Sequence, residues 1–322
     1  MPYVSVVIPA YNAAAFITDA YRSVVDQTID DWEVIFVNDG SQDKTLVIVR
    51  SLAATDKRIK VVDLESNSGP ACARNAAFAI AEGDWIAVLD ADDRYSRDRL
   101  EVLTRAAERT GADIVLDNQF VVDPISRHTA FLAFERKKDD VTILEFTEFL
   151  RNIQSDTFFD FGYLQPIIRR RWLVANDVKY PETLHLGEDL MLLFECYARR
   201  ANVILLSKPY YYYYSQYSRS SRKKSPTSRT EASCKPLLAE MEQFLKKYHS
   251  RLSPLEKRLV ASGCEAIREA MTVAAFRASL KSFDVVELIC NLCRPVRLFR
   301  GIYFANRRSF LQRRALKGVF VE

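Results

Sequence analysis

The 322-residue chain has little histidine, little glycine and no regular cysteine pattern, with 3 His, 9 Gly and 6 Cys. So few histidines disfavour a zinc site, whose usual ligands are histidine and cysteine. Cysteines without a disulfide framework, and no signal peptide before the first apolar run, predict reduced thiols and a cytoplasmic protein. The single CxxC pair, Cys290 and Cys293, stands alone in a basic tail, which favours a structural or incidental role.

Long apolar runs and glycine-rich phosphate loops are also missing. No stretch approaches the ~18 apolar residues of a membrane-spanning helix, so any membrane contact would come from one side. The segment PAYNAAA follows the first predicted strand, where a dinucleotide fold would carry GxGxxG, and neither GxxxxGKS nor GxxxxGKT occurs. These absences disfavour hydride transfer, P-loop chemistry and nucleotidyl transfer.

A regular alternation of two periods occupies the first 117 residues. Short β-branched runs suit buried parallel strands, and the segments between them have helical spacing. The predicted strands are 3–9, 32–39, 59–64, 85–90 and 112–118, and the predicted helices are 13–28, 43–55, 71–82 and 97–110. This order predicts an α/β fold with a doubly wound, mostly parallel sheet. Further elements are expected at 144–153, 187–200, 202–206, 231–249, 254–281 and 284–292.

Open α/β sheets bind ligands outside the carboxyl ends of their strands. Four polar segments stand at those ends: PAYN (9–12), NDGSQDKT (38–45), ESNSGPACARN (65–75) and DADD (90–93). The sheet edge that they share is therefore the predicted ligand site.

The DADD segment holds three acids that repel one another unless they are hydrated or neutralised: Asp90, Asp92 and Asp93. A divalent cation is the most direct neutraliser, and carboxylate oxygens suit Mg2+ or Mn2+. None of the histidines is near this segment in the sequence: they are His128, His185 and His249. The alternative is that the three acids are turn and cap residues before the next helix.

The other strand ends offer groups for a nucleotide. Tyr11 has an aromatic face for stacking, Asp39 can accept a hydrogen bond from a base N–H, and Arg74 can reach a phosphate. Each also has a structural interpretation, as a packing residue, a turn residue or a solvated helix residue. Their convergence on the edge that carries the acids favours the ligand site.

Five segments taken together resemble glycosyltransferase family 2, the inverting nucleotide-sugar transferases of GT-A (Rossmann-like) fold. They are VSVVIPAYN, VNDGSQDKT, NSGPACARNAA, VLDADD and GEDLMLL, the last at 187–193. The resemblance covers roughly residues 3–220. It implies a mostly parallel sheet with flanking helices, followed by a C-terminal helical region. It also implies that Pro9, Ala10 and Tyr11 line the nucleotide pocket, that Asp39 reads the base, usually uracil, and that Arg74 lies near the diphosphate.

The same resemblance assigns the reacting groups. Asp90 and Asp92 correspond to the DXD acids, with Asp92 the closer ligand of a divalent metal, Mn2+ or Mg2+, and Asp90 also on the nucleotide side. Asp189 aligns with the general base that takes the proton of the acceptor hydroxyl. Glu188 either orients the acceptor or Asp189, or supports the helix.

A tyrosine run and a basic segment follow the predicted base. Four residues there are candidates for an acceptor contact or a lid: Tyr212, Tyr214, Ser218 and Ser220. A half-exposed edge strand is the alternative for the tyrosines. The basic segment 215–230 contains no acid and is predicted to be either a lid over the diphosphate or a solvated loop.

The predicted domains are a catalytic domain at 1–225, with a nucleotide-binding part at 1–117 and an acceptor-side part at 118–225, and a helical region at 226–322 with a basic tail. That tail mixes arginines with apolar residues, which is typical of interfacial helices on anionic membranes. Packing on the catalytic domain or in an oligomer is the alternative. Nucleic-acid binding is disfavoured, since no recognised module surrounds the basic residues.

The resulting hypothesis is a metal-dependent inverting glycosyltransferase. It would move a sugar from a nucleotide donor, usually UDP-linked in this family, to a hydroxyl of a glycan or lipid-linked oligosaccharide in surface-polysaccharide assembly. It would act in the cytoplasm, with the inner face of the membrane as a peripheral site. Two alternatives remain: a non-catalytic nucleotide-sugar or glycan-binding module, and a membrane-docked scaffold of the same fold.

Overall fold

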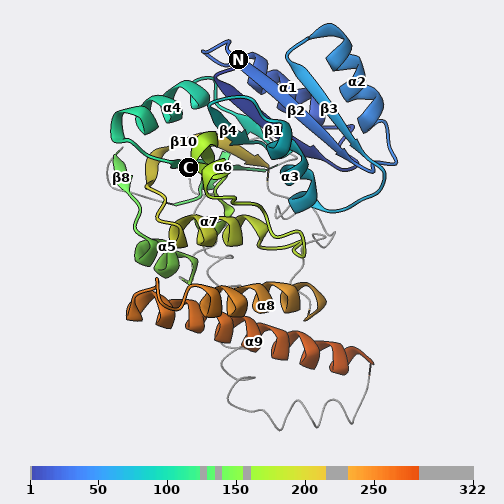
Figure 1. Ribbon diagram of the computed structural model, residues 1–322. Coiled ribbons are helices and arrows are strands. Elements are labelled where there is room, and N and C mark those ends of the chain that lie inside the picture. Colours follow the sequence, from blue (N-terminus) through green and yellow to red (C-terminus); the bar gives the residue numbers. More distant parts are fainter. Residues whose placement is uncertain (1, 124–128, 135–139, 155–160, 215–230, 283–322) are drawn as a thin grey trace, which may run out of the picture. The chain divides into compact units, whose positions relative to one another are not determined.

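Figure 1 shows the computed structural model, which describes residues 2–123, 129–134, 140–154, 161–214 and 231–282. Two compact units divide the chain: the first comprises Met1–Leu144 and Gly162–Ser220, and the second comprises Glu145–Phe161 and Ser221–Glu322. The basic segment 215–230 with Ser218 and Ser220, the expected helix at 284–292 and the tail with its CxxC pair lie outside the described residues.

One half of the sheet in the first unit is parallel. The four strands in this half, in spatial order, are β3 (Ile59–Leu64), β2 (Trp32–Asp39), β1 (Val4–Ala10) and β4 (Trp85–Val88). Strands β1 and β2 are almost wholly buried, which explains why their sequences are continuously apolar and β-branched. The helices that alternate with them are α1 (Ile17–Val25), α2 (Thr45–Thr55) and α3 (Pro70–Ile80) (Figure 1).

The other half of the sheet mixes directions. Strand β9 (Ile167–Arg169) lies antiparallel between β4 and β6 (Ile114–Val122), and β6 pairs in parallel with β10 (Val203–Tyr214). Helix α4 (Arg99–Thr110) packs against β6. Three more short strands pair antiparallel with β10 or β6: β5 (Arg94–Tyr95), β7 (Thr129–Leu132) and β8 (Val141–Ile143). The predicted mostly parallel α/β sheet with flanking helices is confirmed, and the short antiparallel strands are additions to it.

Three short elements complete the description of the region before β10. They are η1 (Phe161–Tyr163), α6 (Arg170–Ala175) and α7 (Glu188–Ala198). Helix α7 carries the GED segment at its start, and its N-cap residue Gly187 has a positive φ of 80° that suits glycine. The chain therefore turns sharply before the predicted base, and Glu188 and Asp189 are the first two residues of α7.

The second unit is helical and contains α5 (Phe146–Ile153), α8 (Glu231–Lys247) and α9 (Pro254–Ser282). Helix α9 begins with a capping box in which Ser253 and Glu256 exchange hydrogen bonds with each other's backbone N–H. Within the described residues, no helix is long and apolar enough to cross a membrane.

The structure groups one segment differently from the predicted domains. Residues 145–161 belong to the second unit, where Phe146 packs edge-on against Phe244 at 6.3 Å and the Gln154 side chain donates to the Leu259 carbonyl. The short helix α5 has a strongly amphipathic sequence, and its apolar face is buried against the long helices. The predicted domain boundary near residue 225 therefore stays a proposal. Residues 145–161 are an exception to it, because they belong to the second unit.

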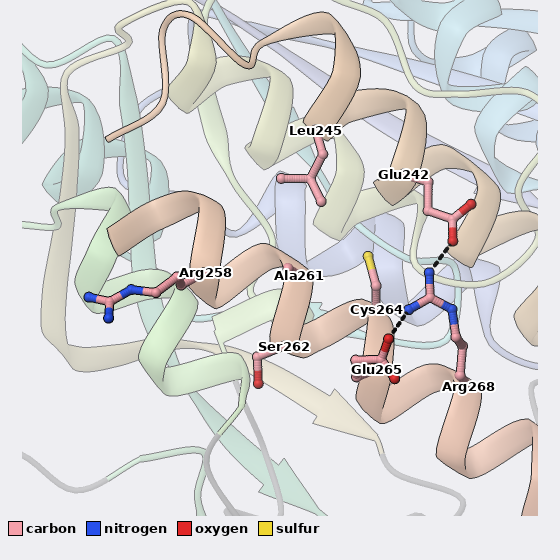
Figure 2. Close-up of a pocket in the computed structure, with 8 residues that line it drawn as sticks. All are labelled: Glu242, Leu245, Arg258, Ala261, Ser262, Cys264, Glu265 and Arg268. Atoms are coloured by element: carbon pink, nitrogen blue, oxygen red, sulfur yellow. Dashed lines mark hydrogen bonds and ion pairs between the residues drawn. The ribbon is translucent and has the colours of Figure 1, made fainter. Parts of the chain in front are cut away.

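A shallow groove of about 350 Å3 lies between α8 and α9 (Figure 2). Arg268 forms ion pairs with Glu242 on α8 and Glu265 on α9, so two carboxylates share one guanidinium on this side of the groove. Burial raises the pKa of the Cys264 thiol to about 11, so this side chain is an uncharged thiol at neutral pH. None of the predicted site residues lines this groove.

Candidate active site

The loops after β1 and β2 are tied to each other by hydrogen bonds. Asn12, at φ of 50°, donates its backbone N–H to the Ser41 hydroxyl at 3.0 Å, and its side-chain oxygen accepts from the Gln42 N–H at 2.8 Å. One residue further on, the Ala13 N–H donates to the Thr45 hydroxyl oxygen at 2.8 Å. The two loops therefore form one rigid wall of the predicted nucleotide pocket.

The three predicted pocket residues on β1 differ in exposure. Pro9 and Ala10 lie in register with Val37 and Asn38 of β2, and the Ala10 side chain is buried. Tyr11 follows directly and is 48% exposed, so its ring is accessible for stacking.

Asp39 organises the NSG turn before α3. Its side chain is buried, and its two carboxylate oxygens accept from the backbone N–H groups of Ser68 at 2.7 Å and Gly69 at 2.9 Å. Gly69 has φ of 90°, and a Cβ there would lie 2.5 Å from the His185 ring. Each carboxylate oxygen has a second lone pair, so a hydrogen bond to a nucleotide base stays a prediction compatible with this geometry.

The three acids of the DADD segment have different surroundings. Asp90 accepts from Arg74 at 2.8 Å and from the Gln165 amide at 3.1 Å. Asp93 is buried and accepts from the Tyr211 hydroxyl at 2.8 Å and from the Tyr214 N–H at 2.7 Å. Asp93 therefore shapes the loop, and both of its oxygens are already bonded.

Asp92 is the acid that remains available. Its side chain is exposed, and no ion pair among the described residues involves its carboxylate. The protein around it nevertheless removes enough water to raise the pKa of Asp92 to about 6, and the negative charge of Asp90 adds to this shift. A cation at this carboxylate would favour its charged form.

Arg74, on α3, joins the two acidic segments. Its guanidinium lies 2.8 Å from Asp90, 3.0 Å from Glu188 and 3.4 Å from Asp189, and only 4% of its side chain is exposed. Although burial alone would lower the pKa of Arg74, the surrounding carboxylates raise it well above its usual value. Its ion-pair partners among the described residues are therefore carboxylates, whereas the sequence predicted a position near the diphosphate. That role stays a prediction.

Asp189 has the properties of a base that works near neutral pH. Burial raises its pKa to about 7, Arg74 opposes this shift, and the negative charges of Glu188 and Asp90 add to it. Its side chain keeps 18% exposure, so a substrate hydroxyl can approach. A pKa near the working pH suits a group that must accept a proton and release it again.

The tyrosine run lies on β10 and contacts the same loop. Tyr212 stacks on Phe120 at 4.8 Å, and the Arg94 guanidinium lies 5.3 Å from the Tyr214 ring. Strand β10 is covered here by the two-residue strand β5. Acceptor or lid roles for Tyr212 and Tyr214 stay predictions, and the structure adds that Tyr211 supports Asp93.

The acids fit a divalent metal only in part. Among the described residues, no three His, Cys, Asp or Glu side chains form a ready metal site. Mg2+ sites in nucleotide enzymes, however, use one or two carboxylates and complete the shell with substrate phosphates. Asp92 has the free carboxylate that this arrangement needs. Arg74 supplies one positive charge for the three carboxylates it contacts, so the cluster keeps an excess of negative charge.

The sequence did not predict Gln165 and Tyr211 as parts of this edge. Gln165 precedes β9, a strand too short to be predicted, and Tyr211 lies within a tyrosine run whose register was ambiguous. Asn12, within the predicted PAYN segment, has a positive φ, which asparagine tolerates better than most residues.

An α/β protein in which one arginine, Arg74, joins Asp90 at a strand end to Asp189 at a helix start is the class that this geometry defines. The family model described as "Glycosyl transferase family 2" matches residues 5–171. The chain belongs to glycosyltransferase family 2. It is 36% identical over 195 residues to "Succinoglycan biosynthesis protein ExoO" of Rhizobium meliloti (strain 1021), which covers 60% of this chain and 55% of that protein. The chain spans about half the length of the first curated relatives it matches.

Solved structures share the fold. Staphylococcus aureus TarS 1-349 in complex with UDP-GlcNAc aligns with a TM-score of 0.59 and 24% identity, over 86% of this chain and 73% of that one. The mannosyltransferase PcManGT from Pyrobaculum calidifontis, in complex with GDP-Man and Mn2+, aligns with a TM-score of 0.56 and 17% identity, over 99% of this chain and 87% of that one. At these identities the likeness establishes the GT-A fold alone.

Proposed function

We propose that the chain is a divalent-metal-dependent, inverting glycosyltransferase that moves a sugar from a nucleotide donor, UDP-linked, to an acceptor hydroxyl. The observation that carries the proposal is the shared guanidinium of Arg74. It contacts Asp90 from the DXD segment and Asp189 from helix α7, which are far apart in the sequence. A fold that only bound a sugar nucleotide would not need a buried base beside the donor acids.

The proposed reaction begins with Asp189. Its carboxylate accepts the proton of the acceptor hydroxyl while the hydroxyl oxygen bonds to C1 of the donor sugar. The bond between C1 and the diphosphate oxygen breaks on the opposite face, and the nucleoside diphosphate leaves with the bonding electrons. Configuration at C1 is therefore inverted, and no second protein acid is required.

The roles of the remaining residues follow from their positions. Asp92, with Asp90, would hold the metal, which supplies charge stabilisation for the departing diphosphate. Arg74 favours the ionised form of Asp189 and fixes Glu188 beside it. Tyr11 would stack on the base and Asp39 would accept from its N–H. The TarS 1-349 structure is a complex with UDP-GlcNAc, which supports a UDP-linked donor for this chain as well.

The acceptor class rests on relatives. The name of ExoO refers to succinoglycan biosynthesis, and TarS is named a poly(ribitol-phosphate) N-acetylglucosaminyltransferase. We therefore extend the proposal to a surface glycan or a lipid-linked oligosaccharide as acceptor. A cytoplasmic place with peripheral membrane contact through the basic tail belongs to the same proposal.

A thermal-shift panel of UDP-, GDP- and dTDP-sugars, each with Mn2+ or with EDTA, tests the donor. A ligand at about 100 times its Kd stabilises the folded state by about 2.7 kcal/mol, and we expect this with a UDP-sugar and Mn2+. Release of UDP with a glycan acceptor separates an enzyme from a binding module. If nucleotides stabilise the chain but no UDP is released with any acceptor or metal tested, the non-catalytic binding module is favoured. If no nucleotide stabilises the chain, both the enzyme and the binding module are rejected.

A further inference from the structure

The Asp90 carboxylate is held at both of its oxygens by different kinds of donor. One oxygen accepts from the charged Arg74 guanidinium at 2.8 Å, and the other accepts from the neutral Gln165 amide at 3.1 Å. A neutral donor fixes a carboxylate without cancelling its charge. Asp90 keeps 26% exposure of its side chain, so the group that Gln165 holds still faces a possible ligand.

Gln165 is itself fixed by the interior of the first unit. Gln165 is buried, with 5% of the residue exposed, and its backbone carbonyl accepts from the Arg99 guanidinium at 2.7 Å. Arg99 also pairs with Asp117 at 2.8 Å, and both of these side chains are fully buried. Strand β9 begins two residues later and pairs with β4 and β6. The contacts of its backbone with Arg99 and with the sheet therefore fix the position of the Gln165 side-chain amide.

The same buried group supports the other end of the acidic segment. The Arg99 guanidinium lies 4.3 Å from the Tyr95 ring and 5.2 Å from the Tyr211 ring. The Tyr211 hydroxyl donates to Asp93 and accepts from the Asp90 N–H at 3.2 Å. Asp92 lies between these two supports, and its carboxylate forms neither an ion pair nor a hydrogen bond with another side chain among the described residues.

We propose that Gln165 is a positioning residue that holds the Asp90 carboxylate in place for the metal-bound nucleoside diphosphate. The proposal rests on the proposed function, because it assigns a task within the same site. A carboxylate that already has its binding conformation loses no side-chain entropy when the ligand binds. The residue that holds it there must itself be fixed by rigid elements of the fold. Gln165 meets both conditions, although it lies outside all five segments that carry the family resemblance.

Gln119 provides a matched control. It is fully buried on β6, its amide donates to the Tyr163 carbonyl at 3.0 Å, and its side-chain oxygen has no hydrogen-bond partner, as is also true of Gln165. Within the described part of the chain, no hydrogen bond joins it to Asp90. Replacing either glutamine with methionine keeps the length of the side chain and removes its polar end, so both variants suffer a similar loss of buried hydrogen bonding.

The test measures UDP binding by calorimetry, with Mn2+ and with EDTA, for the full chain and its variants. We expect Gln165→Met to weaken Mn2+-dependent UDP binding about tenfold, the range for one hydrogen bond to a charged group. Gln119→Met should bind as the unchanged chain does, at a comparable thermal midpoint. In an Asp90→Asn background, Gln165→Met should cause no further loss, because the carboxylate that it positions is gone.

Each other outcome overturns the proposal. Equal binding by Gln165→Met, an equal loss in Gln119→Met, or a loss that persists with Asp90→Asn would each show that Gln165 only fills space. If Gln165→Met does not fold, Gln165→Asn replaces it, because asparagine keeps the amide but is one methylene too short to reach Asp90. An unchanged chain that binds no nucleoside diphosphate would reject the proposed function itself, which is a distinct result.

Discussion

Two arginines that are buried in the described part of the first unit, Arg74 and Arg99, have opposite charge balances. Arg99 pairs with one carboxylate, Asp117, and lies against two tyrosine rings, so its charge is matched. Arg74 contacts the carboxylates of Asp90, Glu188 and Asp189, so negative charge is in excess around it. A matched buried pair serves the fold. An unmatched cluster is costly to the fold alone, and in the proposed function this cluster handles a cation and a proton.

The largest effect is expected on the unmatched side. Asp189→Asn keeps the size of the side chain but removes the proton acceptor, so transfer should fall by a factor of about 100 to 10,000. UDP-sugar binding with Mn2+ should change little. Product formation over time, beside calorimetric binding, measures both quantities. Full turnover by this variant would remove Asp189 from the role of base.

Arg99→Met tests the matched side. It leaves Asp117 buried without a counter-charge, which typically costs about 3–5 kcal/mol of unfolding free energy. Urea unfolding followed by circular dichroism measures the loss. Divalent cations should not restore stability, because Asp117 is fully buried. A loss below the scatter of the measurement would contradict the structural role.

Arg74→Met tests the unmatched side in the same way. We expect a smaller loss of about 1–3 kcal/mol, the cost of an unsatisfied group, because water reaches Asp90 and Asp189 in part. Millimolar Mn2+ or Ca2+ should raise the thermal midpoint of this variant more than that of the unchanged chain. If the cations raise the thermal midpoint of the Arg74 and Arg99 variants equally, the proposed difference in charge balance between the two sites is wrong.

The smallest expected effect separates neighbouring acids. Asp92→Asn should weaken Mn2+-dependent UDP binding by about tenfold, the loss of one charged contact, with little change in stability, because its side chain is exposed. Asp93→Asn should lower stability more than binding, because its carboxylate holds Tyr211 and Tyr214. Titration calorimetry and thermal unfolding of the pair give the contrast, and the reverse pattern would exchange the roles of the two acids.

The sequence predicted the parallel half of the sheet well, because β1, β2 and β3 are each a β-branched run with a helix directly after it. Strand β9 was not predictable, since three residues pair only because β4 and β6 lie on either side. Because β9 is antiparallel to its neighbours, its amino end lies at the edge where the parallel strands have their carboxyl ends. Inspecting only carboxyl ends therefore does not find Gln165. Gln165 lies at this edge although it precedes the start of β9. The local sequence LQPIIRR does not indicate that the strand is antiparallel.

The contacts of Arg74 show the same limit within the site. Its place on α3 and the presence of Asp90 and Asp189 were foreseeable from short motifs. The pairing of one guanidinium with acids from two distant segments depends on how α7 is placed against the sheet, which local patterns do not encode. The exposure of Asp92 and the burial of Asp93, one residue apart, are likewise decided by β10.

The bonds from Asp39 to the NSG turn bear on the kinetics of ligand entry. Because the carboxylate already holds the Ser68 and Gly69 N–H groups, the turn before α3 is shaped without a ligand. Binding of a nucleotide at this preformed surface does not require a loop to fold first. Association at this part of the pocket should therefore be governed by diffusion and orientation, and differences in affinity between related nucleotides should be expressed in how fast they leave.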